Sequence, residues 1–198
     1  MIIETATPDD LARLLTFREE AAAWLSDLGT DQWRRPYPAD KLLATIESGV
    51  VYMVRDGEVT AATITLTPEA EAGLWTDQEL VERSIFVNKL TVARTHAGRD
   101  LGGQLLNWAA DRAYRSGATW LRLDAWTTNK PLQHYYLRHG FTHVRTVTEG
   151  GAVNGGPRVS GWLAQRATAP ECHDFDDLTS QLAVGCHEHQ PPSTEGAT

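Results

Sequence analysis

The residues of this sequence that could do chemistry gather around three glycines, Gly98, Gly102 and Gly103. They follow Val87–Val92, which predicts a strand, and they lie at the start of a run of leucines and alanines at helical spacing from Leu101 onward. The first amides of a helix have no acceptor within it, and the helix dipole makes this end positive. A phosphate can approach such a backbone closely where glycine leaves out the Cβ atom. The spacing therefore predicts a phosphate site.

Two common phosphate motifs do not fit these glycines. A dinucleotide-binding fingerprint would need G-x-G-x-x-G after the first strand of the chain, whereas this unit lies mid-chain with another spacing. A Walker loop would end in Gly-Lys-Ser or Gly-Lys-Thr, and here Gly-Gly-Gln stands instead. Both interpretations fit less well than a third one, which rests on a resemblance described next.

The stretch LTVARTHAGRDLGGQLL resembles the acyl-CoA-binding motif of the GNAT N-acetyltransferase superfamily. In that motif a strand ends in L-x-V, and Arg/Gln-x-x-Gly-x-Gly/Ala opens the following helix. Leu90 and Val92 match the strand end, and Gly102 matches the last glycine. Ala97 stands where Arg or Gln is usual, and Asp100 stands where the first glycine is usual.

A second stretch resembles the same superfamily. Asn129, Tyr136, Gly140 and Phe141 match the pattern N-x-x-x-x-x-x-Y-x-x-x-G-F, downstream of the predicted strand WLRLDAW. Two motifs in the right order are much more specific than either alone. The resemblance covers roughly Met1–Arg166, and the wording AAAWLSDLGTDQW is similar to that of small actinobacterial-type acetyltransferases.

The resemblance implies an α/β (α+β) fold with a mixed, mostly antiparallel central sheet, flanked by helices and splayed at an acyl-CoA cleft. The implied co-substrate is acetyl-CoA or another acyl-CoA, without a metal. Its pyrophosphate would lie on the amides of the glycine-rich loop, and strand amides would polarise the thioester carbonyl. The residues implied to bind it are Leu90, Thr91, Val92, Ala97, Gly98, Arg99, Asp100, Leu101, Gly102, Gly103 and Asn129.

Asp100 is the least expected residue of this loop, because a carboxylate repels phosphate. Asp is favoured as a helix N-cap, so we expect its side chain to cap the helix while its amide still faces the phosphate. Arg99 or Arg94 would neutralise the carboxylate and add charge-assisted hydrogen bonds to phosphate. Solvated surface positions are an equal alternative for both arginines.

Tyr136 occupies the position of the tyrosine that, in enzymes of this superfamily, protonates the departing thiolate, a role open to a positioned Tyr hydroxyl. Spacing alone would also fit a core aromatic on the inner face of an amphipathic helix. We expect Tyr135 to serve packing. No general base is evident: Glu82, Asp31 and Asp124 are candidates, and each also fits a plain surface or structural acid.

Two segments are expected to select the acceptor, Trp24–Tyr37 and Thr67–Trp75. Aromatic residues beside acids in the first segment suggest a cavity for an amine with an apolar body, although the tryptophans could simply cover the sheet. The predicted acceptor-binding residues are Trp24, Asp31, Trp33 and Asn88.

Hydrophobic periodicity and turn residues predict the elements that must position these groups. Strands are predicted at Ile2–Ala6, Val50–Arg55, Glu58–Leu66, Val87–Val92, Trp120–Ala125, Phe141–Glu149 and Val159–Arg166, and helices at 7–25, Ala39–Ser48, 101–116 and 129–140. The dipeptide Asp56-Gly57 predicts a hairpin between the second and third strands. Thr67–Arg83 is expected to be irregular.

Charge separates two parts of the chain. Ala167–Thr198 holds six acids and no Lys or Arg, so the net charge of −8 leaves −2 for Met1–Arg166. We predict an acetyltransferase domain over residues 1–166 and an acidic, mobile tail over 167–198 that could dock locally. Neither part has the basic excess of nucleic-acid-binding proteins, so we expect no nucleic-acid partner.

Several features favour a cytoplasmic protein. No apolar run approaches the length of a membrane span, and the N-terminus lacks the basic and apolar regions of a signal peptide. Cys172 and Cys186 lie outside the predicted core, which therefore needs no disulfide. Histidines stand beside both cysteines, but not at the spacing of a compact zinc site.

These observations favour an acetyl-CoA-dependent N-acetyltransferase that acts by direct attack of the amine of a small molecule or amino-acid-like metabolite. Two alternatives remain open. One is a non-catalytic GNAT module that binds acyl-CoA, which Asp100 and the missing base favour. The other is a transferase that uses aminoacyl-tRNA, which the near-neutral domain disfavours. The acceptor, the acyl chain length and the oligomeric state, a homodimer included, are not determined by the sequence.

Overall fold

A computed structural model describes residues 1–29, 33, 35–150 and 158–179. Its elements are β1 (Ile2–Thr5), α1 (Leu11–Asp27), α2 (Ala39–Glu47), β2 (Val51–Asp56), β3 (Val59–Thr67), α3 (Asp77–Leu80), β4 (Ser84–Val92), α4 (Leu101–Arg115), β5 (Trp120–Trp126), α5 (Lys130–Arg138), β6 (Thr142–Thr146), β7 (Ser160–Ala167) and β8 (Asp176–Asp177). Within these ranges no helix has the length and apolar character needed to span a membrane.

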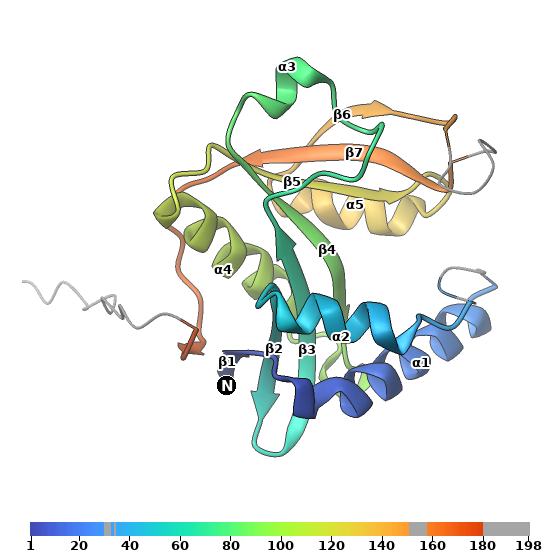
Figure 1. Ribbon diagram of the computed structural model, residues 1–198, viewed down its shortest axis with the longest axis vertical. Helices are drawn as coiled ribbons and strands as arrows, with labels where there is room; N and C mark the ends of the chain where they lie inside the picture. The colour runs from blue at the N-terminus through green and yellow to red at the C-terminus, as the bar shows by residue number, and fades with distance from the viewer. Residues whose placement is uncertain (30–32, 34, 151–157, 180–198) are drawn as a thin grey trace, which may run out of the picture.

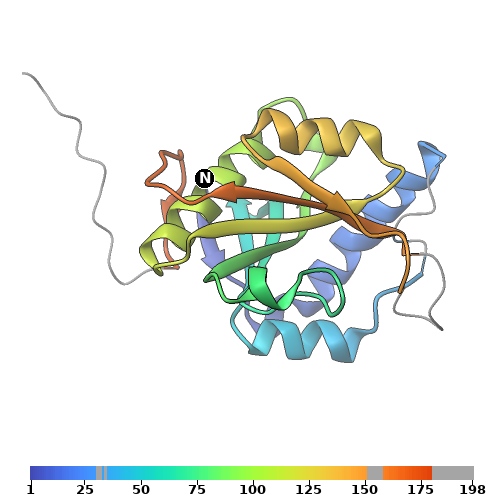
Figure 2. The ribbon, with the colours of Figure 1, turned by 90° about the horizontal axis from the view of Figure 1, so that it is seen from above.

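The strands of the described residues form one eight-stranded sheet, in the order β6-β7-β5-β4-β3-β2-β1-β8 (Figure 1). The pairs β4–β5 and β1–β8 are parallel, and the other pairs are antiparallel. Helices α1 and α2 cover one face, and α4 and α5 cover the other (Figure 2). The predicted mixed, mostly antiparallel sheet with flanking helices is confirmed.

Alternation along β2 explains why both faces of the sheet need a helical layer. Val51 and Met53 belong to the apolar cluster with α1 and α2, whereas Tyr52 and Val54 belong to the cluster under α4. Successive strand side chains point to opposite faces, so four buried residues in a row must be covered on both sides. The predicted hairpin is also confirmed, with Gly57 in its turn at φ +59°.

Helix α4 is held rigidly against the sheet. Leu105, Leu106, Trp108 and Ala109 are at most 1% exposed, and each buried large apolar side chain contributes about 1.5–3 kcal/mol relative to an exposed one. This packing fixes the axis of α4, and with it the place where its first amides point.

Three segments of the domain differ from the prediction. β6 ends at Thr146, three residues before the predicted end of its strand at Glu149. β4 begins at Ser84, three residues earlier than expected, because Ser84–Val87 pair with the start of β5. The segment expected to be irregular contains α3, whose start is closed by a capping box between Thr76 and Glu79. The Thr-x-x-Glu spacing that signals such a box was visible in the sequence.

Part of the predicted tail packs on the domain, within the described residues 168–179. The two residues of β8 add a parallel strand beside β1, and Phe175 is buried. The Nε1–H of Trp108 donates to Oδ2 of Asp177 at 2.8 Å. The local docking that the sequence analysis allowed for the tail is therefore present in this segment, while the division into a domain and a mobile tail stays a prediction. The rest of the predicted tail, 180–198 with Cys186, lies outside the described residues.

Candidate active site

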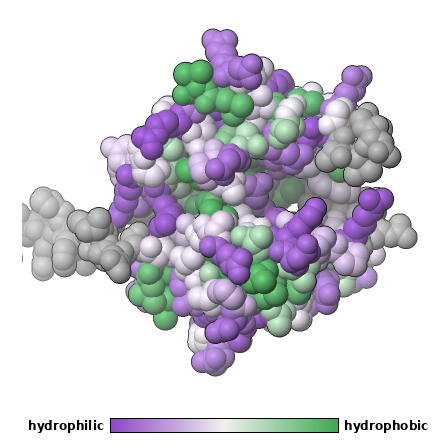
Figure 3. All heavy atoms as spheres, in the orientation of Figure 1, coloured by the Kyte–Doolittle hydropathy of each residue, from purple (hydrophilic) through white to green (hydrophobic). Residues whose placement is uncertain are grey.

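A pocket begins where β4 and β5 separate. The two strands pair only from Ser84 with Trp120 to Val87 with Leu123, although both continue beyond this point. Past the fork Lys89 has a left-handed backbone, φ +51°, at an irregularity in the pairing with β3. The opening forms a pocket of about 1370 Å³ that extends from the start of α4 to α1. Figure 3 shows the surface hollowed on the face that carries α1 and α2.

Most of the predicted site residues line this pocket. They are Trp24, Trp33, Asn88, Leu90, Thr91, Val92, Ala97, Gly98, Asp100, Leu101, Gly102, Asn129 and Tyr136. Arg99 and Gly103 belong to the same loop and helix start without lining the pocket, and Asp31 lies outside the described residues. The structure thus brings together the two motifs, while the roles of individual residues stay predictions.

The start of α4 depends on an unusual backbone conformation. Asp100 is the N-cap residue and has a left-handed conformation with φ +52°. Glycine adopts this conformation most readily, which accounts for the glycine usual at this position of the motif, and Asp tolerates it better than most residues. Its side chain makes no capping hydrogen bond, so the predicted side-chain cap is wrong.

The carboxylate of Asp100 is placed near α5. Its Oδ1 lies 3.5 Å from Nε2 of His139, and burial lowers the pKa of His139 although the charge of Asp100 opposes this. The predicted neutralising partner Arg94 instead places its guanidinium over the ring of Trp24, 4.3 Å from the centroid, and lines the pocket there. Arg94 therefore offers a positive charge to a pocket ligand.

The two glycines at the start of α4 also make room for α5. A Cβ on Gly102 would lie 2.4 Å from the hydroxyl oxygen of Tyr135, and one on Gly103 would lie 2.3 Å from Cε1 of His139. The Tyr135 and His139 rings themselves pack 4.4 Å apart. The glycines therefore serve the close approach of two helices, a role that the sequence analysis did not predict.

Helix α5 carries two adjacent tyrosines that both line the pocket. Asn129 caps the helix as predicted, accepting from the amide of Leu132 at 3.1 Å. Tyr136 is 7% exposed, and burial raises the pKa of its hydroxyl, so it stays protonated and able to donate near neutral pH. Tyr135 was expected only to pack, but it is half-buried in the pocket wall, where burial raises its pKa to about 12.

Of the three acids considered as a general base, the structure places one in the pocket. Asp124 lines it beside the fork, and burial raises the pKa of its carboxyl group. Glu82 lies outside the pocket, where it accepts from Nη2 of Arg122 at 2.7 Å. Asp31 falls outside the described residues.

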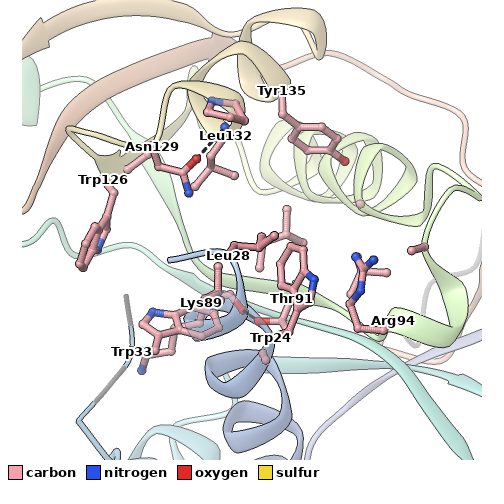
Figure 4. A pocket seen from close by; sticks show the side chains of 18 of the residues that line it. Trp24, Leu28, Trp33, Lys89, Thr91, Arg94, Trp126, Asn129, Leu132 and Tyr135 are labelled. Carbon is pink, nitrogen blue, oxygen red and sulfur yellow. Dashed lines mark hydrogen bonds between the residues drawn. The ribbon is translucent and has the colours of Figure 1, made fainter. Parts of the chain in front are cut away.

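The far end of the pocket contains two residues that the sequence analysis missed, Trp126 and Lys89. In Figure 4, Trp33 and Trp126 lie at one end, and Arg94 and Tyr135 at the other. Lys89 also lines the pocket, and its ammonium group donates to the hydroxyl of a tyrosine in the α1–α2 connection at 2.9 Å. Lys89 reaches the pocket because its backbone is left-handed at an irregularity in the pairing of β4 with β3, and this conformation cannot be predicted from the residue type.

Comparison with known proteins identifies a family. Residues 17–141 match the model of the acetyltransferase (GNAT) family. The chain is similar to the Bacillus subtilis protein named uncharacterized N-acetyltransferase YesJ, with 30% identity over 142 residues that cover 69% of this chain and 78% of that protein.

Solved structures share the fold. A GNAT family acetyltransferase from Listeria monocytogenes is 21% identical, with a TM-score of 0.68 over 84% of this chain and 94% of that one. The structure of yncA from Salmonella typhimurium with its cofactor acetyl-CoA is 18% identical, with a TM-score of 0.59 over 86% of this chain and 95% of that one. Together with the family match, these findings show that the chain belongs to the GNAT family of N-acetyltransferases.

Proposed function

We propose that this N-acetyltransferase moves the acetyl group of acetyl-CoA to the primary amine of a small molecule by direct attack. The observation that carries the proposal is a pocket that connects the amides at the start of α4 with the fork between β4 and β5, where Tyr136 lines the wall. The acetyl-CoA held by yncA supports the choice of donor.

The donor would lie along the α4 side of this pocket. The positive end of a 15-residue helix and the guanidinium of Arg94 favour a pyrophosphate there. Leu90, Thr91 and Val92 line the next part of the wall, and their amides would polarise the thioester carbonyl. The carboxylate of Asp100 opposes the phosphates, so we expect it to weaken donor binding.

The chemistry would take place at the fork. The amine nitrogen attacks the carbonyl carbon, the carbon–sulfur bond breaks, and the hydroxyl of Tyr136 gives its proton to the departing thiolate. Tyr136 is protonated at neutral pH and therefore has a proton to give, while the pKa that burial raises makes it a weaker acid than a free tyrosine.

The acceptor would enter from the end opposite to α4. Trp33, Trp126 and the exposed side chain of Leu28 provide apolar walls there. Asp124 provides a carboxylate, whereas the carboxylate of Glu71, which also lines the pocket, pairs with Arg158. This combination suits a cationic amine with an apolar body.

Titration calorimetry with acetyl-CoA, followed by a thiol-release assay with a panel of primary amines, tests the proposal. We expect saturable binding, a melting temperature that rises with acetyl-CoA concentration, and thiol release with at least one amine. Heat that shows no saturation at millimolar acetyl-CoA would contradict the proposed donor. Saturable binding without thiol release from any amine would favour a non-catalytic acyl-CoA-binding module.

A further inference from the structure

Asp124 occupies the first position on β5 past the fork. Its neighbour Leu123 is the last β5 residue that pairs with β4, opposite Val87. The Asp124 side chain therefore lies where the two strands open, and it lines the pocket while remaining partly accessible. Tyr136 lines the same pocket and is close enough for the charge of Asp124 to raise its pKa further.

The surroundings of Asp124 hold its carboxylate without neutralising it. From β7, Oγ of Ser160 donates a hydrogen bond to Oδ2 of Asp124. Arg158 also faces Asp124, but this guanidinium pairs with Oε1 of Glu71 at 2.6 Å and donates to two backbone carbonyls. Among the described residues no cation forms an ion pair with Asp124. The carboxylate of Asp124 thus remains available to a cationic ligand.

We propose that Asp124 is the general base of this enzyme: it binds the ammonium group of the acceptor and takes its proton. This inference rests on the proposed function. It also names the acceptor class, an amine that enters the pocket as a protonated, cationic group.

The proton balance is simple. The ammonium group gives one proton to the carboxylate of Asp124, and the neutral amine then attacks the thioester carbon. The carbon–sulfur bond breaks, and Tyr136 protonates the thiolate. The amide nitrogen loses its second proton as the product forms, and this proton restores the Tyr136 hydroxyl through solvent. Asp124 returns its own proton to solvent, so each turnover releases one proton.

The geometry and electrostatics agree with this role. Burial raises the pKa of Asp124, while Ser160 and Arg158 lower it and Glu71 raises it. A carboxylate with a raised pKa is a stronger base, and this is the direction of shift that general-base catalysis near neutral pH requires. A purely structural Asp124 would only tie β5 to Ser160, and the two roles predict different kinetics.

The test compares Asp124→Asn with the wild type by acetyl-CoA affinity, melting temperature and thiol release. Two kinds of acceptor are used: alkylamines that are protonated at the assay pH, and weakly basic nucleophiles such as hydroxylamine that are neutral there. With alkylamines we expect a loss of about two to four orders of magnitude in turnover. With hydroxylamine we expect nearly the wild-type rate, and acetyl-CoA affinity should not change.

Two further variants make the result specific. Asp77→Asn removes an exposed acid at the start of α3, outside the pocket, and should behave as the wild type. Asp124→Glu keeps a carboxylate and should recover part of the alkylamine activity. The loss in Asp124→Asn should shrink as the pH rises, because the alkylamine then loses its proton to solvent.

Equal losses with both kinds of acceptor, or wild-type turnover of alkylamines by Asp124→Asn, would overturn the assignment. A folded wild type that releases no thiol with any acceptor would instead overturn the proposed function and, with it, this inference. Because the first outcome needs an active wild type and the second an inactive one, the two failures are distinguishable.

Discussion

The two ends of the pocket are built in different ways, although they form one cavity. The α4 end is built largely from one short stretch after β4, in which Gly98, Asp100, Leu101 and Gly102 line the pocket at the start of the helix. The fork end consists of side chains that are distant in sequence, such as Trp33 from the α1–α2 connection, Asp124 from β5 and Ser160 from β7. A motif can encode the first end, whereas the fold must assemble the second.

Charge follows the same division. The positive end of a helix dipole and Arg94 favour an anion at the α4 end, where Asp100 is the opposing charge. At the fork end, Glu71 is paired with Arg158 and Lys89 donates to a tyrosine hydroxyl, which leaves the carboxylate of Asp124 for a cationic acceptor. If the division is real, substitutions at the α4 end should change donor affinity, and substitutions at the fork should change turnover.

The largest effect is expected for Tyr136→Phe. Loss of the hydroxyl removes the proposed proton donor, so turnover should fall by about two to four orders of magnitude. The ring keeps its packing against Phe141, at 5.7 Å between centroids, so melting temperature and acetyl-CoA affinity should stay close to the wild type. Thiol release, calorimetry and thermal denaturation measure the three quantities in parallel.

The exposed Tyr114 on α4 provides the matched control, and Tyr114→Phe should change none of them. Wild-type turnover of Tyr136→Phe at every pH tested would remove this residue from the mechanism and make solvent the proton donor.

Gly103→Ala alters the start of α4 and should lower the affinity for acetyl-CoA. The new Cβ would meet Cε1 of His139 at 2.3 Å and the carboxylate of Asp100 at 2.6 Å, so the His139 ring and the Asp100 side chain at the start of α4 have to move. Overpacking of this kind costs about 1–3 kcal/mol, and a cost of that size borne by donor binding lowers acetyl-CoA affinity by roughly 5- to 150-fold. Saturated turnover should change little.

The His139→Ala background removes the ring that the new Cβ meets. Calorimetry should therefore show a smaller affinity loss for Gly103→Ala in that background than in the wild type. An equal loss in both backgrounds would show that this close approach does not explain the effect.

Substitutions of Asp100 test whether its negative charge weakens the binding of acetyl-CoA. Asp100→Asn keeps the size of the side chain and tolerance of the left-handed backbone while removing the charge, so acetyl-CoA affinity should rise several-fold, more at low salt than at high salt. Asp100→Gly should raise affinity and also relieve backbone strain of about 1 kcal/mol. Calorimetry at two salt concentrations checks both variants, and a lower affinity for Asp100→Asn would show that the carboxylate helps to bind the donor.

The smallest effect is expected for a substitution in α3, which lies outside both ends of the pocket. Hydrogen bonds from Arg145 hold the pKa of Glu79 at about 2, well below its usual value of 4.5. Stability from this lowered pKa is fully present above about pH 4.5 and is lost as the pH falls through about 2. Glu79→Gln should therefore lower the melting temperature by about 2–4 °C at neutral pH, for a pair worth about 1 kcal/mol.

The difference between Glu79→Gln and the wild type should shrink toward pH 2, as thermal denaturation across pH can show. Donor affinity and turnover at neutral pH should match the wild type. A changed affinity in this variant would show that the pocket is sensitive to general loss of stability.

The sequence could predict what local patterns encode. The strand–loop–helix unit, the Asn129 cap and the hairpin at Gly57 all depend on neighbouring residues, and all three are present. The left-handed Asp100 was not predictable, because Asp is also a common side-chain cap. The match to small actinobacterial-type members stays a prediction.

Contacts between residues that lie far apart in the chain could not be predicted from the sequence, for a physical reason. Asp124 and Ser160 are 36 positions apart and meet only because β5 pairs with β7. The two residues of β8 are too few for any hydrophobic period, and their place beside β1 depends on Phe175 and Asp177 finding partners in the folded core. Such contacts are properties of the assembled sheet.

The most direct test of the divided pocket is thiol release measured over a range of acetyl-CoA concentrations, at saturating amine, for the wild type, Gly103→Ala and Tyr136→Phe. We predict that Gly103→Ala raises the acetyl-CoA concentration at half-saturation and keeps the plateau. Tyr136→Phe should lower the plateau and keep the half-saturation point. If both variants change the same parameter, donor binding and chemistry are not divided between the two ends of the pocket.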